Sequence, residues 1–213
     1  MYRKQMTFQR ILCILVIVIS AAVFVYALGF MTDANDMIQN CALGYEPDVN
    51  EAPEVKAAIE AKKAPMRRYM EDMNLFDRDF VKAGIALILL SLTLLLTNTH
   101  TRRKYYISNY IAVLLNVCGA FAASIWAHQQ IVRLKDFYYS GAIDFEYVKF
   151  TTGTFVQENS VNVYTESAFW FDVHYYIFGV MLLMAALLIL NAIWKIILMK
   201  HEKNALAVGR NGK

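Results

Sequence analysis

The sequence predicts an all-α membrane protein with four transmembrane helices, both termini in the cytoplasm, and two loops on the outside. Of the 213 residues, 58% are apolar and 18% are charged, whereas soluble domains average about 45–50% and about 25%. The apolar residues are concentrated in four blocks, and the basic residues are concentrated beside the ends of those blocks. These three observations exclude an ordinary soluble domain.

Each apolar block is long enough to cross a bilayer as a helix. Lys82 is the only Asp, Glu, Lys or Arg within blocks 11–30, 80–97, 105–127 and 173–194. About 20 helical residues cross the ~30 Å hydrocarbon core, and lipid offers the backbone no hydrogen bonds. We therefore expect transmembrane helices at 11–31, 80–98, 105–128 and 172–194. The first block exceeds the ~7–15 apolar residues of a cleaved signal peptide, which favours an uncleaved anchor.

The distribution of basic residues predicts the orientation. Eleven of the 21 basic residues, but only one acid, lie in the N-terminus 1–10, the turn 99–104 and the tail 195–213. The two longer loops hold nine basic residues against sixteen acids. The positive-inside rule then places both termini in the cytoplasm of a plasma-membrane protein, with loops 32–79 and 129–171 outside. The same clustering disfavours nucleic acid as a partner.

The first outside loop is expected to be partly helical. Pro53 and the alanine-rich run after it indicate a short helix that Pro65 ends. Beyond Pro65, apolar residues recur at helical spacing, at Met66, Tyr69, Met70, Met73 and Phe76. The spacing predicts an amphipathic helix over 66–79 that is continuous with the second transmembrane helix.

The second outside loop is expected to contain a small β-hairpin. The third helix should continue to about Tyr138, and Ser140-Gly141 should end it. After this, β-branched and aromatic residues dominate 149–157 and 161–165, with Glu158-Asn159-Ser160 as the turn. An isolated hairpin is marginally stable in water, so it should pack on the helices or on another protein.

One polar residue, Asn116, lies near the middle of a predicted span. Gly119 and Ala123 follow it at small-xxx-small spacing. Asparagine and small residues are typical of close helix–helix contacts, so we interpret these three residues as a packing interface rather than a transport path.

His128, Asp172 and His174 lie at the predicted outer helix ends. A metal or acid–base site there would need these ends to meet and to recruit a third ligand. No metalloprotease, CxxC or phosphate-loop motif is present. We therefore expect no metal, no cofactor and no catalysis, and we interpret the three residues as interfacial.

Two further features favour a bacterial protein. Cys41 is the only cysteine outside the predicted spans, so the loops cannot form a disulfide within one chain. The outside loops also contain no N-x-[ST] glycosylation sequon.

The last third of the chain resembles a group of known proteins. Asp144-Phe145, the run VKFTTGTFVQ and Phe169-Trp170-Phe171-Asp172 resemble small multispan membrane proteins of Gram-positive bacteria that accompany sugar ABC importers. The resemblance implies partner permeases in the same membrane and implies no catalytic residue.

These features lead us to expect a noncatalytic accessory or assembly subunit of a larger membrane complex, with a sugar ABC transporter favoured. Aromatic residues of the second loop, notably Phe145, Tyr147, Phe169 and Trp170, are candidates for the partner surface. The first alternative is an outside-facing sensor or ligand-binding protein. The second is a membrane enzyme that uses His128, Asp172 and His174.

The predicted orientation has a direct test. Cys41 should react with a membrane-impermeant thiol reagent on intact cells, because its loop is expected outside. Cys41→Ser should abolish the labelling. Labelling that requires cell lysis would show that the orientation is inverted.

Overall fold

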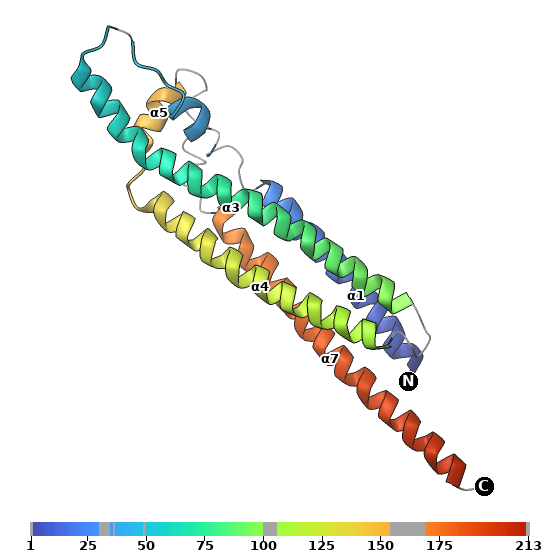
Figure 1. Cartoon of the computed structure of the whole chain (residues 1–213). Coiled ribbons are helices and arrows are strands. Elements are labelled where there is room, and N and C mark those ends of the chain that lie inside the picture. The colour runs from blue at the N-terminus through green and yellow to red at the C-terminus, as the bar shows by residue number, and fades with distance from the viewer. Residues whose placement is uncertain are drawn as a thin grey trace. The chain divides into compact units, whose positions relative to one another are not determined.

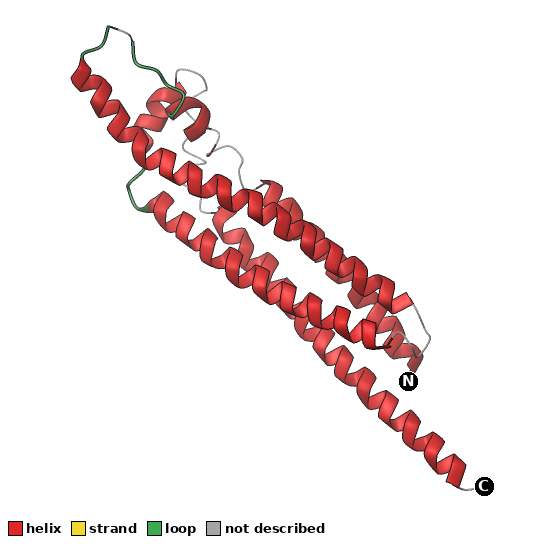
Figure 2. Cartoon of the chain, viewed as in Figure 1, coloured by secondary structure: helices red, strands yellow, loops and turns green. Residues whose placement is uncertain are grey.

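Helices form all the regular structure in the described part of the chain. The computed structural model describes residues 2–29, 35, 37–48, 50–99, 106–153 and 169–211. Every element within these residues is helical, and Figure 2 shows no strand among them. The predicted all-helical class is therefore confirmed for the described residues.

Four of the helices are long and apolar enough to cross a membrane, which confirms the predicted number of spans. They are α1 (Tyr2–Gly29), α3 (Pro53–Thr99), α4 (Tyr106–Tyr139) and α7 (Phe169–Asn211) (Figure 1). Their apolar stretches cover Thr7–Gly29, Pro53–Asn98, Ile107–Tyr139 and Phe169–His201. Between 28% and 39% of the residues in the most apolar windows are buried inside the chain, so most of them face outward.

The chain divides into two compact units, and the first unit is built from all four long helices. It comprises Met1–Phe24, Ala83–Ile125 and Tyr176–Lys213. Each helix contributes to one apolar core, which contains Leu12, Cys13, Val16, Leu94, Ala112, Val113 and Leu188. The backbones of α1 and α3 approach closely at Gly84, where an added Cβ would lie 3.0 Å from Phe24 Cα. Glycine therefore permits this helix contact.

The second unit comprises Val25–Lys82 and Trp126–Tyr175. Its core lines one face of α3, where six side chains are at most 5% exposed: Met66, Tyr69, Met70, Met73, Phe76 and Phe80. Tyr69 stacks on Phe137 of α4, with ring centroids 6.0 Å apart, and also contacts Tyr138 at 5.6 Å. The helical spacing of apolar residues seen in the sequence is thus the spacing of this buried face.

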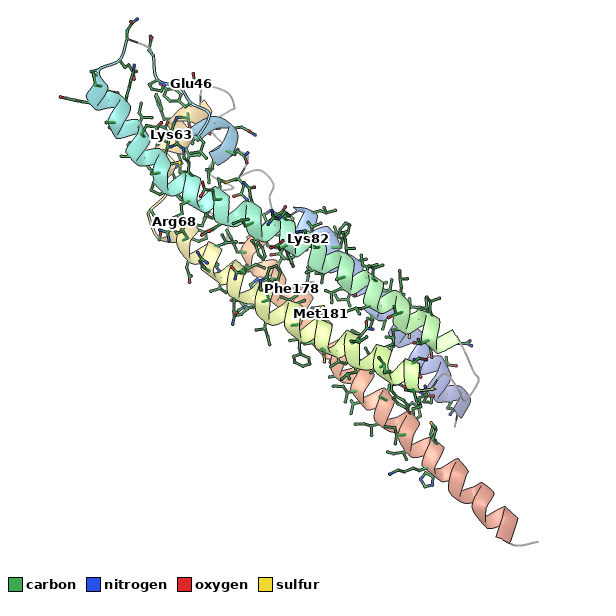
Figure 3. All side chains as sticks on the ribbon, in the orientation of Figure 1. Glu46, Lys63, Arg68, Lys82, Phe178 and Met181 are labelled. Atoms are coloured by element: carbon green, nitrogen blue, oxygen red, sulfur yellow. The ribbon has the colours of Figure 1, made fainter. Side chains whose placement is uncertain are left out.

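The predicted helix end at Pro65 is wrong, because α3 continues through that residue. An internal proline removes one backbone hydrogen bond and crowds the preceding turn, at a cost of about 3 kcal/mol. Buried neighbours on both sides hold the helix together here. The ammonium group of Lys63 (labelled in Figure 3) donates to the backbone carbonyl of Tyr45, and Met66 is fully buried.

The first strand of the predicted hairpin is also wrong. Residues 149–153 belong to a helix, α5 (Phe145–Gly153), and the rest of the predicted hairpin, 154–165, lies outside the described residues. The Tyr147 N–H donates to the Asp144 carboxylate at 3.0 Å, which caps the helix start. The buried residues follow a helical period and not an alternating one: Tyr147, Val148, Thr151 and Thr152. Burial of this face overrides the β-propensity of the sequence.

α5 packs on η1 (Met37–Ala42), a short π-helical segment. The Tyr147 hydroxyl donates to the Ala42 carbonyl at 3.3 Å, and the Tyr147 ring meets that of Tyr45 edge-on at 6.3 Å. Lys62 of α3 bonds the Asp144 carboxylate at 2.9 Å, and this bond lowers the pKa of that carboxyl. Asp144 therefore both caps the start of α5 and forms an ion pair with α3.

The close contact at Gly84 generates a stability prediction. Gly84→Leu should lower the melting temperature in detergent by several degrees, because overpacking against a backbone atom costs about 1–3 kcal/mol. Gly179→Leu is the matched control, since an added Cβ at Gly179 meets nothing within 4 Å. Equal melting temperatures for the two variants would rule out the close approach of α1 and α3.

Candidate functional site

Two of the three residues predicted to pack between helices, Asn116 and Gly119, lie against α3 in the first unit. The Asn116 amide donates to the Leu90 carbonyl of α3 and to the Ala112 carbonyl of its own helix, both at 2.8 Å. One turn later, a Cβ added at Gly119 would lie 2.8 Å from a methyl group of Leu90. Ala123 is half-buried one turn further on. Asn116 thus satisfies an α3 backbone carbonyl and ties α4 to α3.

The first unit also contains a buried polar network that the sequence analysis missed. Asn109 of α4 is at its centre: its carbonyl oxygen accepts from the Gln9 amide and from the Lys195 ammonium group, each at 2.9 Å. The Asn109 amide donates to the Thr97 hydroxyl at 3.3 Å. Gln5 donates to Gln9 at 2.9 Å and to Asn191 at 3.1 Å. The network therefore connects all four long helices.

Loss of any of these hydrogen bonds should destabilise the protein, because the groups that form them are buried. Five members of the network are at most 7% exposed: Gln5, Gln9, Asn109, Asn191 and Lys195. A buried donor that loses its acceptor costs about 1–3 kcal/mol, and a charged donor costs more. The i,i+4 spacing of Gln5 with Gln9 and of Asn191 with Lys195 was the available sequence signal. The sequence instead placed Gln5 and Gln9 in the cytoplasmic N-terminus, Asn191 in the fourth span and Lys195 in the cytoplasmic tail.

In the second unit, the structure brings together two of the three predicted outer-face residues. His128 Nδ1 lies 2.9 Å from His174 Nε2. His174 Nδ1 contacts the Phe171 carbonyl, which can only accept, so this nitrogen is the donor. His174 Nε2 then accepts from His128, and His128 Nε2 becomes the free acceptor on an exposed ring.

Asp172 instead forms an ion pair with Lys135, with 2.7 Å between Asp172 Oδ1 and Lys135 Nζ. Among the described residues, no three His, Cys, Asp or Glu side chains gather closely enough to hold a metal ion. Chemically, the histidine pair can pass a proton between an exposed nitrogen and a buried one.

The aromatic candidates for a partner surface divide into two groups. Tyr147 is buried, and Phe145 packs against Tyr138 with ring centroids 4.9 Å apart, so both belong to the core of the second unit. Phe169 and Trp170 are 62% and 44% exposed. Phe150 on α5, which the sequence analysis did not single out, is 64% exposed.

A groove of about 230 Å³ lies between α3 and α4 in the second unit. Its polar lining includes an ion pair across the two helices, Arg133 Nη2 to Asp72 Oδ2, at 2.9 Å. Its apolar lining includes Phe76 and Trp126, with ring centroids 5.5 Å apart. The remaining lining residues are Leu75, Asp79, Gln130 and Leu134.

No protein-family model, curated protein or solved structure matches this chain.

The polar network generates a second stability prediction. Asn109→Leu should destabilise the protein by about 1–3 kcal/mol, because the Gln9 amide and the Lys195 ammonium group lose their shared acceptor. Adding Lys195→Met to this variant should recover part of the loss, since an apolar pair leaves no stranded charge. Chemical or thermal unfolding in detergent measures both effects, and strictly additive losses would contradict the direct Asn109–Lys195 bond.

Proposed function

We propose that the protein is a noncatalytic accessory or assembly subunit of a larger membrane complex, and that an ABC importer for sugars is the favoured complex. The proposal places it in the plasma membrane of a bacterium, with both termini in the cytoplasm. Exposed aromatic side chains of the second unit carry this proposal: Phe150, Phe169 and Trp170.

Phe150 is the most informative of these residues. α5 lies outside the four membrane-capable stretches, so lipid does not account for an exposed aromatic ring there. The opposite face of the same helix is buried and α5 packs on η1, which fixes the backbone that carries Phe150, and the Phe150 ring meets the Tyr45 ring at a centroid distance of 6.0 Å. Rigid, exposed aromatic residues are enriched at the centres of protein interfaces.

Phe169 and Trp170 are a second pair of exposed aromatic residues, at the start of α7. Their rings contact each other with centroids 5.5 Å apart, and the Trp170 carbonyl accepts from the buried Tyr26 hydroxyl. The backbone that carries the two rings is thus anchored to the second unit. A preorganised surface of this kind loses little conformational entropy when a partner binds.

Copurification tests the assembly role. The tagged full chain, expressed at native level and purified in mild detergent, should carry a stoichiometric integral membrane partner identified by mass spectrometry. Phe150→Ser combined with Phe169→Ser should reduce recovery of the partner at least about tenfold, because removing interface hot spots costs about 2 kcal/mol or more. Val55→Ser is the matched control, since Val55 is also exposed, at 45%, on α3 of the same unit.

The outcomes separate the competing functions. An isolated monomer with no associated permease overturns the proposal. A thermal shift with one class of ligand, without a protein partner, would favour a sensor. Full complex function in the Asp172→Ala, His174→Ala double variant would eliminate an enzyme built on those residues.

A further inference from the structure

We propose that the groove between α3 and α4 binds a single neutral, polyhydroxylated ring, either a free monosaccharide or the sugar headgroup of a glycolipid. The inference concerns the groove alone, and it is independent of the assembly role proposed for Phe150, Phe169 and Trp170.

The size of the groove limits the ligand. Sites for drug-sized molecules measure about 300–1,000 Å³, and this groove measures about 230 Å³. It is open on one side and lined by two adjacent helices, so it accommodates one ring with part of its surface in solvent.

Trp126 provides a fixed aromatic surface for the ring. Its indole packs on Phe76 at 5.5 Å and on Phe80 at 6.4 Å between ring centroids, and both phenylalanines are at most 5% exposed. The indole itself is half-buried and lines the groove. The C–H face of a pyranose is apolar, and it can cover such a surface while its hydroxyl groups point sideways.

Unused hydrogen-bonding groups lie beside this surface. In the described part of the chain, neither the Gln130 amide nor the Trp126 indole N–H has a hydrogen-bond partner in the protein. The amide can both donate and accept, as a hydroxyl group does. The Asp72–Arg133 pair adds a carboxylate acceptor and a guanidinium donor, which suit a pair of adjacent hydroxyl groups.

The charges of the groove favour a neutral ligand. Asp72 is paired with Arg133 at 2.9 Å, and Asp79 is paired with Lys82 at 2.9 Å and with Arg78 at 3.5 Å (Lys82 is labelled in Figure 3). Each carboxylate is already compensated, so an anion or a cation gains little net attraction. A neutral polyol keeps every ion pair and adds hydrogen bonds to it.

Saturation-transfer NMR on the full chain in phosphatidylcholine nanodiscs tests the proposal. The probes are D-glucose, D-galactose and D-mannose, together with glucosamine and glucose 6-phosphate as charged analogues. We expect saturation transfer to the ring protons of at least one neutral sugar. If none responds, nanodiscs containing monoglucosyl diacylglycerol should raise the melting temperature of the protein relative to phosphatidylcholine alone.

Variants locate the signal in the groove. Gln130→Ala should weaken binding about tenfold, and it disturbs no packed ring. Trp126→Leu should abolish binding, with Trp194→Leu as the matched control, since Trp194 is an exposed tryptophan outside the groove. Circular dichroism verifies that each variant remains folded, and Gln130→Ala keeps the test decisive where Trp126→Leu does not fold.

Each outcome decides the proposal. Transfer from a free neutral sugar, or a shift with the glycolipid alone, supports it and identifies the source of the ring. Stronger binding of a charged analogue, unchanged binding by Gln130→Ala, or no response from either source overturns it. None of these results depends on whether a partner protein copurifies.

Discussion

Lipid gives a buried polar group nothing to bond with, and this constraint governs both the fold and its internal contacts. It requires backbone hydrogen bonds to close within each crossing segment, which is why the apolar segments are helices. It applies equally to side chains. Asn116 bonds a backbone carbonyl of the neighbouring helix, and Asn109 collects hydrogen bonds from two other helices. Amide side chains therefore define which helices adjoin one another in the first unit, where apolar contacts alone would be less specific.

The second unit is held together by different contacts. Its links are ion pairs between exposed side chains and contacts between aromatic rings, such as Arg133 with Asp72 and Tyr69 with Phe137. Exposed ion pairs contribute little to stability, about 0–1 kcal/mol each. Most of the stabilisation of this unit therefore comes from burying its aromatic and methionine side chains. Charged groups are consequently left at its surface, where they can bind other molecules.

The sequence predicted the features that depend on local composition and missed those that depend on packing. Four apolar blocks were sufficient to predict four spans, because length and hydropathy decide that property. The helix end at Pro65 was wrong because burial of Lys63 and Met66 outweighs the cost of an internal proline. The strand predicted at 149–153 was wrong for a related reason. Valine and threonine favour strands only in a pleated, half-buried environment, and here they line the buried face of a helix.

In the candidate sites too, the sequence indicates what depends on local position along the chain and misses what depends on packing. His128 and His174 were singled out because they lie at two helix ends on the same predicted side of the membrane, but they were interpreted as interfacial, and their pairing was not predicted. By contrast, Asp72 and Arg133 are 61 residues apart, and no local pattern indicates that they form an ion pair. Trp126 was not singled out from the sequence, yet its ring packs on Phe76 and Phe80 and lines the same groove as that pair. A groove between two helices depends on their relative rotation, and the buried face of α3 helps to set this rotation, since Phe76 belongs both to that face and to the groove lining.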